Sequence, residues 1–409
     1  MLQDIIEVGK KLRLPINTTR INLLYILVSS SLLGHPISAV VQKDSVGILL
    51  MDKDVQIDAT QAVNDMYNFK FEKADRQFRW LAQDYPDHPL PYFLLGLSQW
   101  WRMAPNIDNE SYDETFMQYM DQSLDLAQKL YDKDPENVEA NFFLAAGYGF
   151  KGRLLAERKN WRKAALAGKN ALKYLEKSSD KSDLSPEFLF GDALYNYYSV
   201  WIPENYPILK PILVFFKRGD KELGIKQLQE VATNAFYTRT EAQSYLMRIL
   251  AIEEQELIRA LQVSEYLSTT FPDNSYFHRF YARLLYTTGK HWQAEKESLN
   301  IIQKIDSGKV GYGPVTGRYA AFFLGQIYTH KQQFEDAELY YQRAVSFAEQ
   351  SDDLESGYYL FSLIGLGDIA QQTGDPRGAR ELYKRVKKEA KSSHPAHDRA
   401  KDRLKGMKS

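Results

Sequence analysis

Pairs of positions twelve residues apart recur along the chain and constrain its fold more than any other feature. In most of these pairs both residues are small, and each lies in the middle of a helical pattern. Small side chains there let two helices pack closely. The pairs are Ala62 with Ala74, Ala282 with Ala294, Gly325 with Ala337, Gly367 with Ala379, and Arg248 with Ala260, where arginine replaces the small residue. No alternating strand pattern accompanies them, so the sequence predicts helical hairpins.

Other residues of these hairpins also keep a defined order. The hairpin at residues 275–304 has Tyr281 and Ala282 in its first helix, Gly289 at its turn and Ala294 in its second helix. This order resembles the tetratricopeptide repeat family, whose unit has about 34 residues. The resemblance covers roughly residues 56–390. It implies an all-α fold, a right-handed superhelical solenoid of about eight hairpins with a C-terminal capping helix.

The second, third and fourth hairpins depart from the regular spacing. Their corresponding small residues lie 27, 19 and 33 positions apart, in the pairs Gly96–Ser123, Ala145–Ala164 and Gly191–Gly224. We therefore expect insertions near residues 104–116, 153–160 and 201–219, each between the two helices of its hairpin. Such turns emerge on one edge of a solenoid, where insertions often mark the binding face. Neutral growth of the loops is the alternative.

Residues 1–39 have the features of a secretory signal peptide. Basic residues between Lys10 and Arg20 precede an apolar run of 13 residues that ends at Leu33, and Ala39 follows a proline turn. A bilayer span needs about 20 residues, so the run is short for a membrane helix. We expect an exported protein, periplasmic or envelope-associated, with residues 40–55 as a linker. An uncleaved membrane anchor and an ordinary first helix are the alternatives.

Composition and motifs argue against catalysis. The chain has no cysteine, which excludes disulfides, thiolate metal sites and cysteine nucleophiles. Its net charge of −1 argues against general nucleic-acid binding. The GxGxxG match at residues 147–152 lacks a preceding strand and is expected to serve helix packing. His394 and His397 are expected to cap a helix rather than bind a metal. We predict no enzyme activity, cofactor or metal.

In the tetratricopeptide family the first helix of each hairpin lines a concave groove, and the resemblance implies a set of groove-facing residues. Aromatic side chains predominate among them and offer large contact area at low entropy cost. The alternative is that these rings are buried against one another. The candidate partner-binding residues are Phe93, Trp100, Trp101, Phe142, Phe150, Phe188, Tyr195, Tyr276, Arg279, Arg283 and Tyr286, with Tyr319 and Phe322 in the following hairpin.

Two further segments predict contacts outside the regular repeats. Residues 201–219 contain three prolines, which break a helix, and an apolar run that ends at Phe216. This segment is expected to plug the groove, or to contact a membrane or a partner. The tail from Arg377 carries twelve Lys and Arg against four Asp and Glu. It predicts a basic cap and tail at residues 391–409, with peripheral contact to anionic lipid as the alternative.

These observations predict a non-enzymatic protein-interaction scaffold of the bacterial cell envelope. It would bind a peptide segment or a partner protein in the aromatic-lined groove, most of all where the second to fourth hairpins combine aromatic residues with insertions. A glycan-binding envelope protein is the alternative, because aromatic platforms also suit sugar rings.

Overall fold

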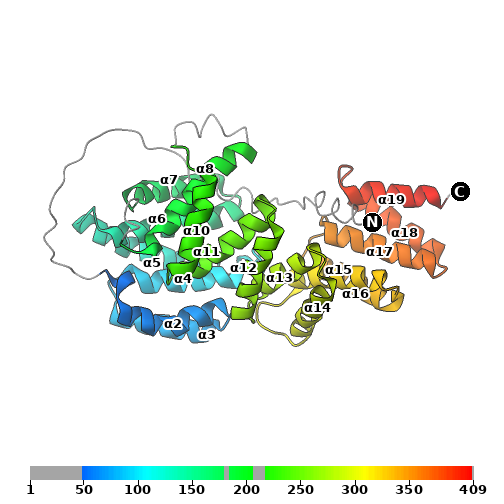
Figure 1. Ribbon diagram of the computed structural model, residues 1–409, viewed down its shortest axis with the longest axis horizontal. Helices are drawn as coiled ribbons and strands as arrows, with labels where there is room; N and C mark the ends of the chain where they lie inside the picture. The colour runs from blue at the N-terminus through cyan, green and yellow to red at the C-terminus, as the bar shows by residue number, and fades with distance from the viewer. Residues whose placement is uncertain (1–47, 179–183, 206–216, 408–409) are drawn as a thin grey trace. The chain divides into compact units, whose positions relative to one another are not determined.

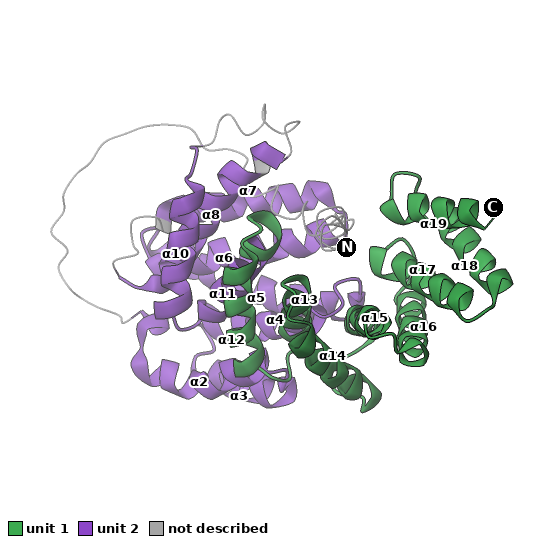
Figure 2. Cartoon of the chain, turned by 45° about the vertical axis from the view of Figure 1, so that its right-hand side comes forward, with its two compact units in different colours: residues 1–17, 250–409 green, residues 18–249 purple. Residues whose placement is uncertain are grey.

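The computed structural model describes residues 48–178, 184–205 and 217–407, which form helices and contain no strand (Figure 1). These residues divide into two compact units. Figure 2 shows unit 2, which ends at Ile249, and unit 1, which begins at Leu250. The expected signal peptide at residues 1–39 and the apolar run that ends at Phe216 lie outside the described residues.

The described residues of unit 2 form four helix pairs followed by a single helix, and the two members of each pair pack against each other. A short 3-10 helix, η1 (Leu49–Met51), precedes them, and another, η2 (Glu110–Tyr112), follows α4. The pairs are α2 (Lys53–Tyr67) with α3 (Phe71–Asp84), α4 (Pro89–Met103) with α5 (Asp113–Lys133), α6 (Val138–Glu157) with α7 (Trp161–Ser178), and α8 (Pro186–Asn205) with α10 (Lys221–Asn234), and α11 (Arg239–Arg248) ends the unit.

Over residues 250–407, unit 1 forms a single helix, three helix pairs and a terminal helix. They are α12 (Leu257–Thr270), α13 (Ser275–Thr287) with α14 (His291–Asp306), α15 (Pro314–His330) with α16 (Phe334–Gln350), α17 (Gly357–Gln372) with α18 (Pro376–Glu389), and α19 (Pro395–Gly406). A π-helical segment, η4 (Ile249–Glu253), spans the boundary between the units. The all-α hairpin architecture is thus confirmed, with α11 and α12 on either side of that boundary.

In each of the last two hairpins, a glycine on the first helix lets a tyrosine ring of the second helix pack closely against it. A Cβ on Gly325 would lie 2.6 Å from the ring of Tyr341, and a Cβ on Gly367 would lie 2.5 Å from the ring of Tyr383. Both glycines precede their tyrosines by 16 residues, so the two hairpins share one register. The turn of the last hairpin uses Gly374 at a φ of 90°, in the left-handed region that glycine favours.

The third hairpin has no inserted loop, which corrects the insertion expected at residues 153–160. Helix α6 continues to Glu157, and only three residues separate it from α7. A Cβ on Gly152 would lie 3.5 Å from the carbonyl oxygen of Ala164, so the twelve-residue spacing holds between these two residues. Five residues of α6 follow Gly152, as five residues of α15 follow Gly325, so the turn of this hairpin has the regular length.

Two other boundaries also differ from expectation. Part of the expected linker at residues 40–55 is structured, because Leu50 is fully buried and its backbone N–H donates to the carboxylate of Glu139 at 2.7 Å. Helix α2 already begins at Lys53. Helix α8 continues through Pro203, which was expected to break it. A proline in the last turn removes only one backbone donor, so the helix tolerates it there.

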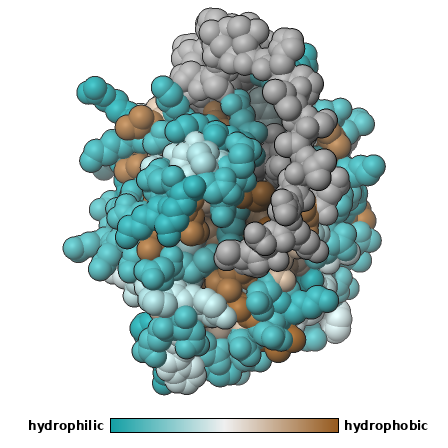
Figure 3. Space-filling view, turned by 90° about the vertical axis from the view of Figure 1, so that its left-hand side faces the viewer, coloured by the Kyte–Doolittle hydropathy of each residue, from teal (hydrophilic) through white to brown (hydrophobic). Residues whose placement is uncertain are grey.

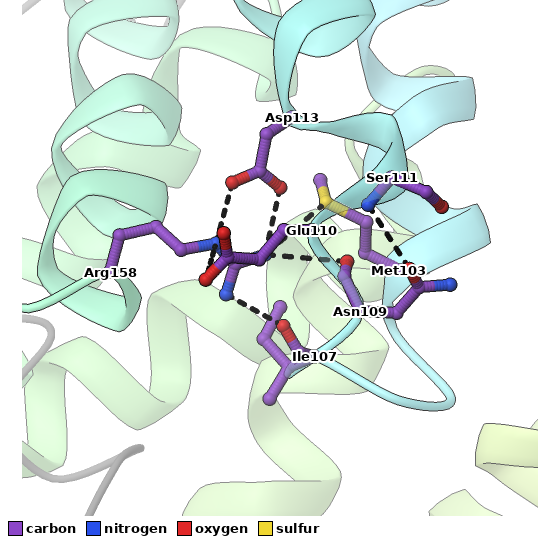
Figure 4. Close-up of polar contacts among 7 residues, drawn as sticks. All are labelled: Met103, Ile107, Asn109, Glu110, Ser111, Asp113 and Arg158. Atoms are coloured by element: carbon purple, nitrogen blue, oxygen red, sulfur yellow. Dashed lines mark hydrogen bonds and ion pairs between the residues drawn. The ribbon is translucent and has the colours of Figure 1, made fainter.

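The first expected insertion is present, and Arg158 fixes it (Figure 4). The guanidinium donates to both carboxylate oxygens of Asp113, at 2.5 and 2.8 Å, and to the carbonyl oxygen of Ile107 at 2.7 Å. The hydrogen bonds to Asp113 raise the pKa of Arg158. Since Arg158 directly follows α6, the loop after α4 is attached to the third hairpin.

The expected cap is confirmed as α19. Ala396 and Ala400 are fully buried, and Arg403 forms an ion pair with Asp368 of α17 at 2.8 Å. The Nδ1 atom of His394 accepts a hydrogen bond from the backbone N–H of Ala396 at 3.1 Å, so this histidine caps the helix as expected.

Candidate anion-binding site

The structure buries most of the aromatic side chains that were expected to line a groove in unit 2. The buried ones are Phe93, Trp100, Trp101, Phe142 and Phe188, whereas Phe150 and Tyr195 are partly buried. The ring of Phe150 lies 5.8 Å from that of Phe93 and 5.7 Å from that of Trp100, between centroids. These rings pack against one another, so the expectation of an exposed aromatic lining is corrected for the buried residues.

A carboxylate on the first turn of α11 contacts one of these buried rings, that of Trp101. Glu241 accepts hydrogen bonds from Trp101 Nε1 at 2.6 Å and from the Tyr67 hydroxyl at 3.3 Å. Burial raises the pKa of Glu241, although the bond from Trp101 and the charge of Arg153 act in the opposite direction. Helices α2, α4 and α11 therefore meet inside unit 2, and side chains of the unit itself fill the space between them.

Several apolar side chains of unit 2 are exposed. The face drawn in Figure 3 is mostly hydrophilic, with separate hydrophobic patches. Single exposed apolar residues are ordinary on protein surfaces. Those of unit 2 include Ile57, Trp80, Leu166, Leu184 and Leu223.

The other sequence motifs have structural roles. A Cβ on Gly147 would lie 2.8 Å from a methyl carbon of Leu124, so the GxGxxG stretch lies inside α6 and serves helix packing, as expected. Within the part of the chain that the structure describes, no cluster of three His, Cys, Asp or Glu side chains could hold a metal ion. Among the described helices, none combines the length and the apolarity that a membrane span requires.

Unit 1 places two arginines at one tyrosine ring, and a third arginine lies one turn from the first of them. Arg279 and Arg283 lie one turn apart on α13, and Arg318 lies on α15. The guanidinium carbons of Arg279 and Arg318 lie 5.3 and 5.4 Å from the centre of the Tyr319 ring. Tyr358 of α17 packs on Tyr319 with ring centroids 4.3 Å apart. We call Arg279, Arg283, Arg318, Tyr319 and Tyr358 the arginine cluster.

The ionisable groups of the arginine cluster perturb one another. Burial would raise the pKa of the Tyr319 phenol, but the three arginines outweigh burial and the pKa lies below its ordinary value. Burial lowers the pKa of Arg279, and the charges of Arg318 and Arg283 lower it further. Burial raises the pKa of Tyr358 to about 12. The positive charges are therefore close enough to repel one another.

Such an arrangement favours an anionic ligand. Like charges one turn apart on a helix destabilise it, and an anion placed between them converts repulsion into attraction. The planar guanidinium fork of arginine matches the two oxygens of a carboxylate. The carboxylate of Asp353 also contacts the cluster and lies 2.7 Å from Arg318.

Sequence reasoning found part of this site. Arg279 is among the expected groove residues, and its guanidinium carbon lies 5.5 Å from the ring of Tyr276, another of them. The expected residue Tyr286 instead stacks on Phe323 of α15, with centroids 4.6 Å apart, and so belongs to the packing between helices. Arg318 is not among the groove residues expected from the sequence. Its position one turn before Phe322, an expected groove residue, could have indicated it.

Structures of three helical-repeat proteins are similar to much of the chain. A human IFIT1 dimer with PPP-AAAA is 14% identical with a TM-score of 0.40, covering 77% of this chain and 67% of that chain. Yeast Tom70 is 13% identical with a TM-score of 0.27, covering 87% and 96%. The P58(IPK) TPR domain is 12% identical with a TM-score of 0.24, covering 87% and 99%.

A tetratricopeptide repeat model matches one part of the chain, whereas no curated protein matches the sequence. Residues 318–388 match the family model described as tetratricopeptide repeat. This stretch lies within α15 to α18, the two hairpins whose glycine–tyrosine register is the same. The similarity of this chain to the tetratricopeptide repeat family is therefore strongest on sequence grounds at these two hairpins.

Proposed function

We propose that this protein is a non-enzymatic interaction scaffold that binds an acidic segment of a partner protein at the arginine cluster. The observation that carries the proposal is the approach of Arg279 and Arg318 to the Tyr319 ring, with Arg283 one turn from Arg279 on α13. The cluster replaces the aromatic side chains of unit 2 as the expected contact surface, because most of those are buried.

Partial burial makes the arginine cluster more effective than charges on an open surface. Arg279, Arg283 and Arg318 are each partly buried, so water screens them less than it screens exposed side chains. Tyrosine rings beside the guanidinium groups supply apolar contact area and a hydroxyl. An acidic peptide would therefore gain charge-assisted hydrogen bonds together with contacts to its backbone and carbon atoms.

Replacing Arg283 by glutamine is expected to weaken binding of a fluorescein-labelled hexaglutamate peptide about ten-fold, measured by fluorescence anisotropy. The variant removes one positive charge from the cluster and leaves a polar side chain of similar length. Binding by the unchanged protein should also weaken as salt is added, because exposed parts of the interaction are screened.

The matched control is Arg377→Gln, which removes the same charge from an exposed position on α18, outside the cluster. It should bind the peptide like the unchanged protein. Equal affinity of Arg283→Gln and the unchanged protein would refute the proposed site. Preference for a short RNA, or for soluble glycans over the peptide, would instead refute the proposed class of ligand.

We further propose that the protein is exported and acts in the periplasm or elsewhere in the bacterial cell envelope. Support comes from the basic residues, the apolar run and Ala39 within residues 1–39. Intact-mass measurement of protein from the native cell should give a chain that starts near Val40. A full-length mass in the soluble fraction would contradict export, and a full-length mass in the membrane fraction would indicate an anchor.

A further inference from the structure

An internal carboxylate already occupies part of the arginine cluster. Asp353 lies between α16 and α17, and its carboxylate oxygen is 2.7 Å from a terminal guanidinium nitrogen of Arg318. The other terminal nitrogen of Arg318 donates to the hydroxyl of Ser351 at 3.1 Å. The Arg318 side chain is only 12% exposed, whereas the Asp353 side chain is 29% exposed. The carboxylate thus reaches Arg318 from the more accessible side.

Backbone interactions hold Asp353 in this place independently of its ion pair. Its N–H donates to the carbonyl oxygen of Ala348 at 3.0 Å, and the hydroxyl of Ser356 donates to its carbonyl oxygen at 3.1 Å. Ser356 is also the N-cap of α17. The preceding residue, Asp352, has a φ of 50°, which fixes the direction of the turn. The turn therefore presents a carboxylate to the cluster whether or not a ligand is bound.

We propose that Asp353 is a built-in competitor that lowers the affinity of the arginine cluster for the carboxylates of a partner. This inference rests on the proposed function, because it concerns the ligand of the same site. Asp353 forms an ion pair with Arg318 and occupies one of its guanidinium nitrogens. An incoming carboxylate must share Arg318 with Asp353 or displace it. The chain thereby keeps binding of acidic segments weak and reversible.

A purely structural role for Asp353 predicts a different result. If the ion pair only held Arg318 in its binding geometry, loss of the carboxylate would loosen Arg318 and weaken binding. If Asp353 competes with the ligand, loss of its charge strengthens binding, even though the folded state loses an ion pair. The direction of the change in affinity therefore separates the two roles, and a lower melting temperature is compatible with both.

The test compares Asp353→Asn with Asp352→Asn in the full chain, using the hexaglutamate peptide. Asp352 is exposed and adjacent, so the control removes the same charge from the same turn. We expect Asp353→Asn to bind about five-fold more tightly, with a steeper dependence on salt, and Asp352→Asn to change affinity less than about two-fold.

Unchanged or weaker binding by Asp353→Asn would overturn the inference, as would an equal gain from both variants. The Arg283→Gln variant separates this failure from failure of the proposed function. If Arg283→Gln loses affinity while Asp353→Asn gains none, the site stands and only the competitor role is refuted. If the unchanged protein and Arg283→Gln bind the peptide equally, both proposals fail.

Discussion

Replacing Trp101 by alanine is expected to destabilise unit 2 by about 4–5 kcal/mol, near the upper end for truncation of a buried aromatic residue. The indole is 2% exposed, and its ring meets that of Tyr67 at a centroid distance of 5.3 Å. Its N–H also donates to Glu241, so truncation removes both packing and a hydrogen-bond donor to a buried carboxylate. Helices α2, α4 and α11 should all lose protection from hydrogen exchange.

Hydrogen–deuterium exchange with mass spectrometry is the suitable measurement, because it reports these helices separately and does not require two-state unfolding of the whole chain. Backbone exchange in α4 and α11 should accelerate by about a thousand-fold, provided that these amides exchange through opening of the unit. Trp80→Ala is the matched control, because Trp80 is 58% exposed on α3 and its loss should change stability by less than about 0.5 kcal/mol. Similar exchange in both variants would mean that Trp101 is not part of the core.

Replacing Glu187 by alanine is expected to cost about 3–5 kcal/mol and to release the start of α11. Glu187 lies on the first turn of α8, is 1% exposed, and its carboxylate accepts from the backbone N–H groups of Phe236, Tyr237 and Thr238. The Thr238 hydroxyl donates to it as well, at 2.7 Å. Without the carboxylate, these donors are left without an acceptor, and a buried donor without a partner is costly.

The control for Glu187 is Glu222→Ala, since Glu222 is an exposed glutamate on the first turn of α10. The two positions have the same relation to their helix ends, so any general effect of a negative charge near a helix N-terminus is present in both. Only Glu187→Ala should accelerate hydrogen exchange at residues 236–248. Comparable exchange in the two variants would show that the carboxylate does not hold α11.

The sequence alone determines the hairpins, because their signal is local. The twelve-residue spacing, and the glycine that faces a tyrosine in each of the last two hairpins, report contacts between neighbouring helices. The cap was predictable for the same reason, since His394 and Ala396 act within one turn of α19. The spacing of small residues gives the wrong register for the third hairpin, because Ala145 and Gly152 are both small. The packing of Gly152 on α7 identifies the correct register.

The tertiary structure decides which side chains remain accessible. An apolar residue on the first helix of a hairpin indicates that its side chain avoids water. It does not indicate whether a partner or the chain itself covers that side chain. Trp101 meets Glu241 across 140 positions in the sequence, and no local pattern encodes such a contact. Likewise, the approach of Arg279 and Arg318 to the Tyr319 ring depends on how successive hairpins stack. The sequence therefore specified the repeating hairpin, while contacts beyond the hairpin buried the expected aromatic surface and assembled the charged one.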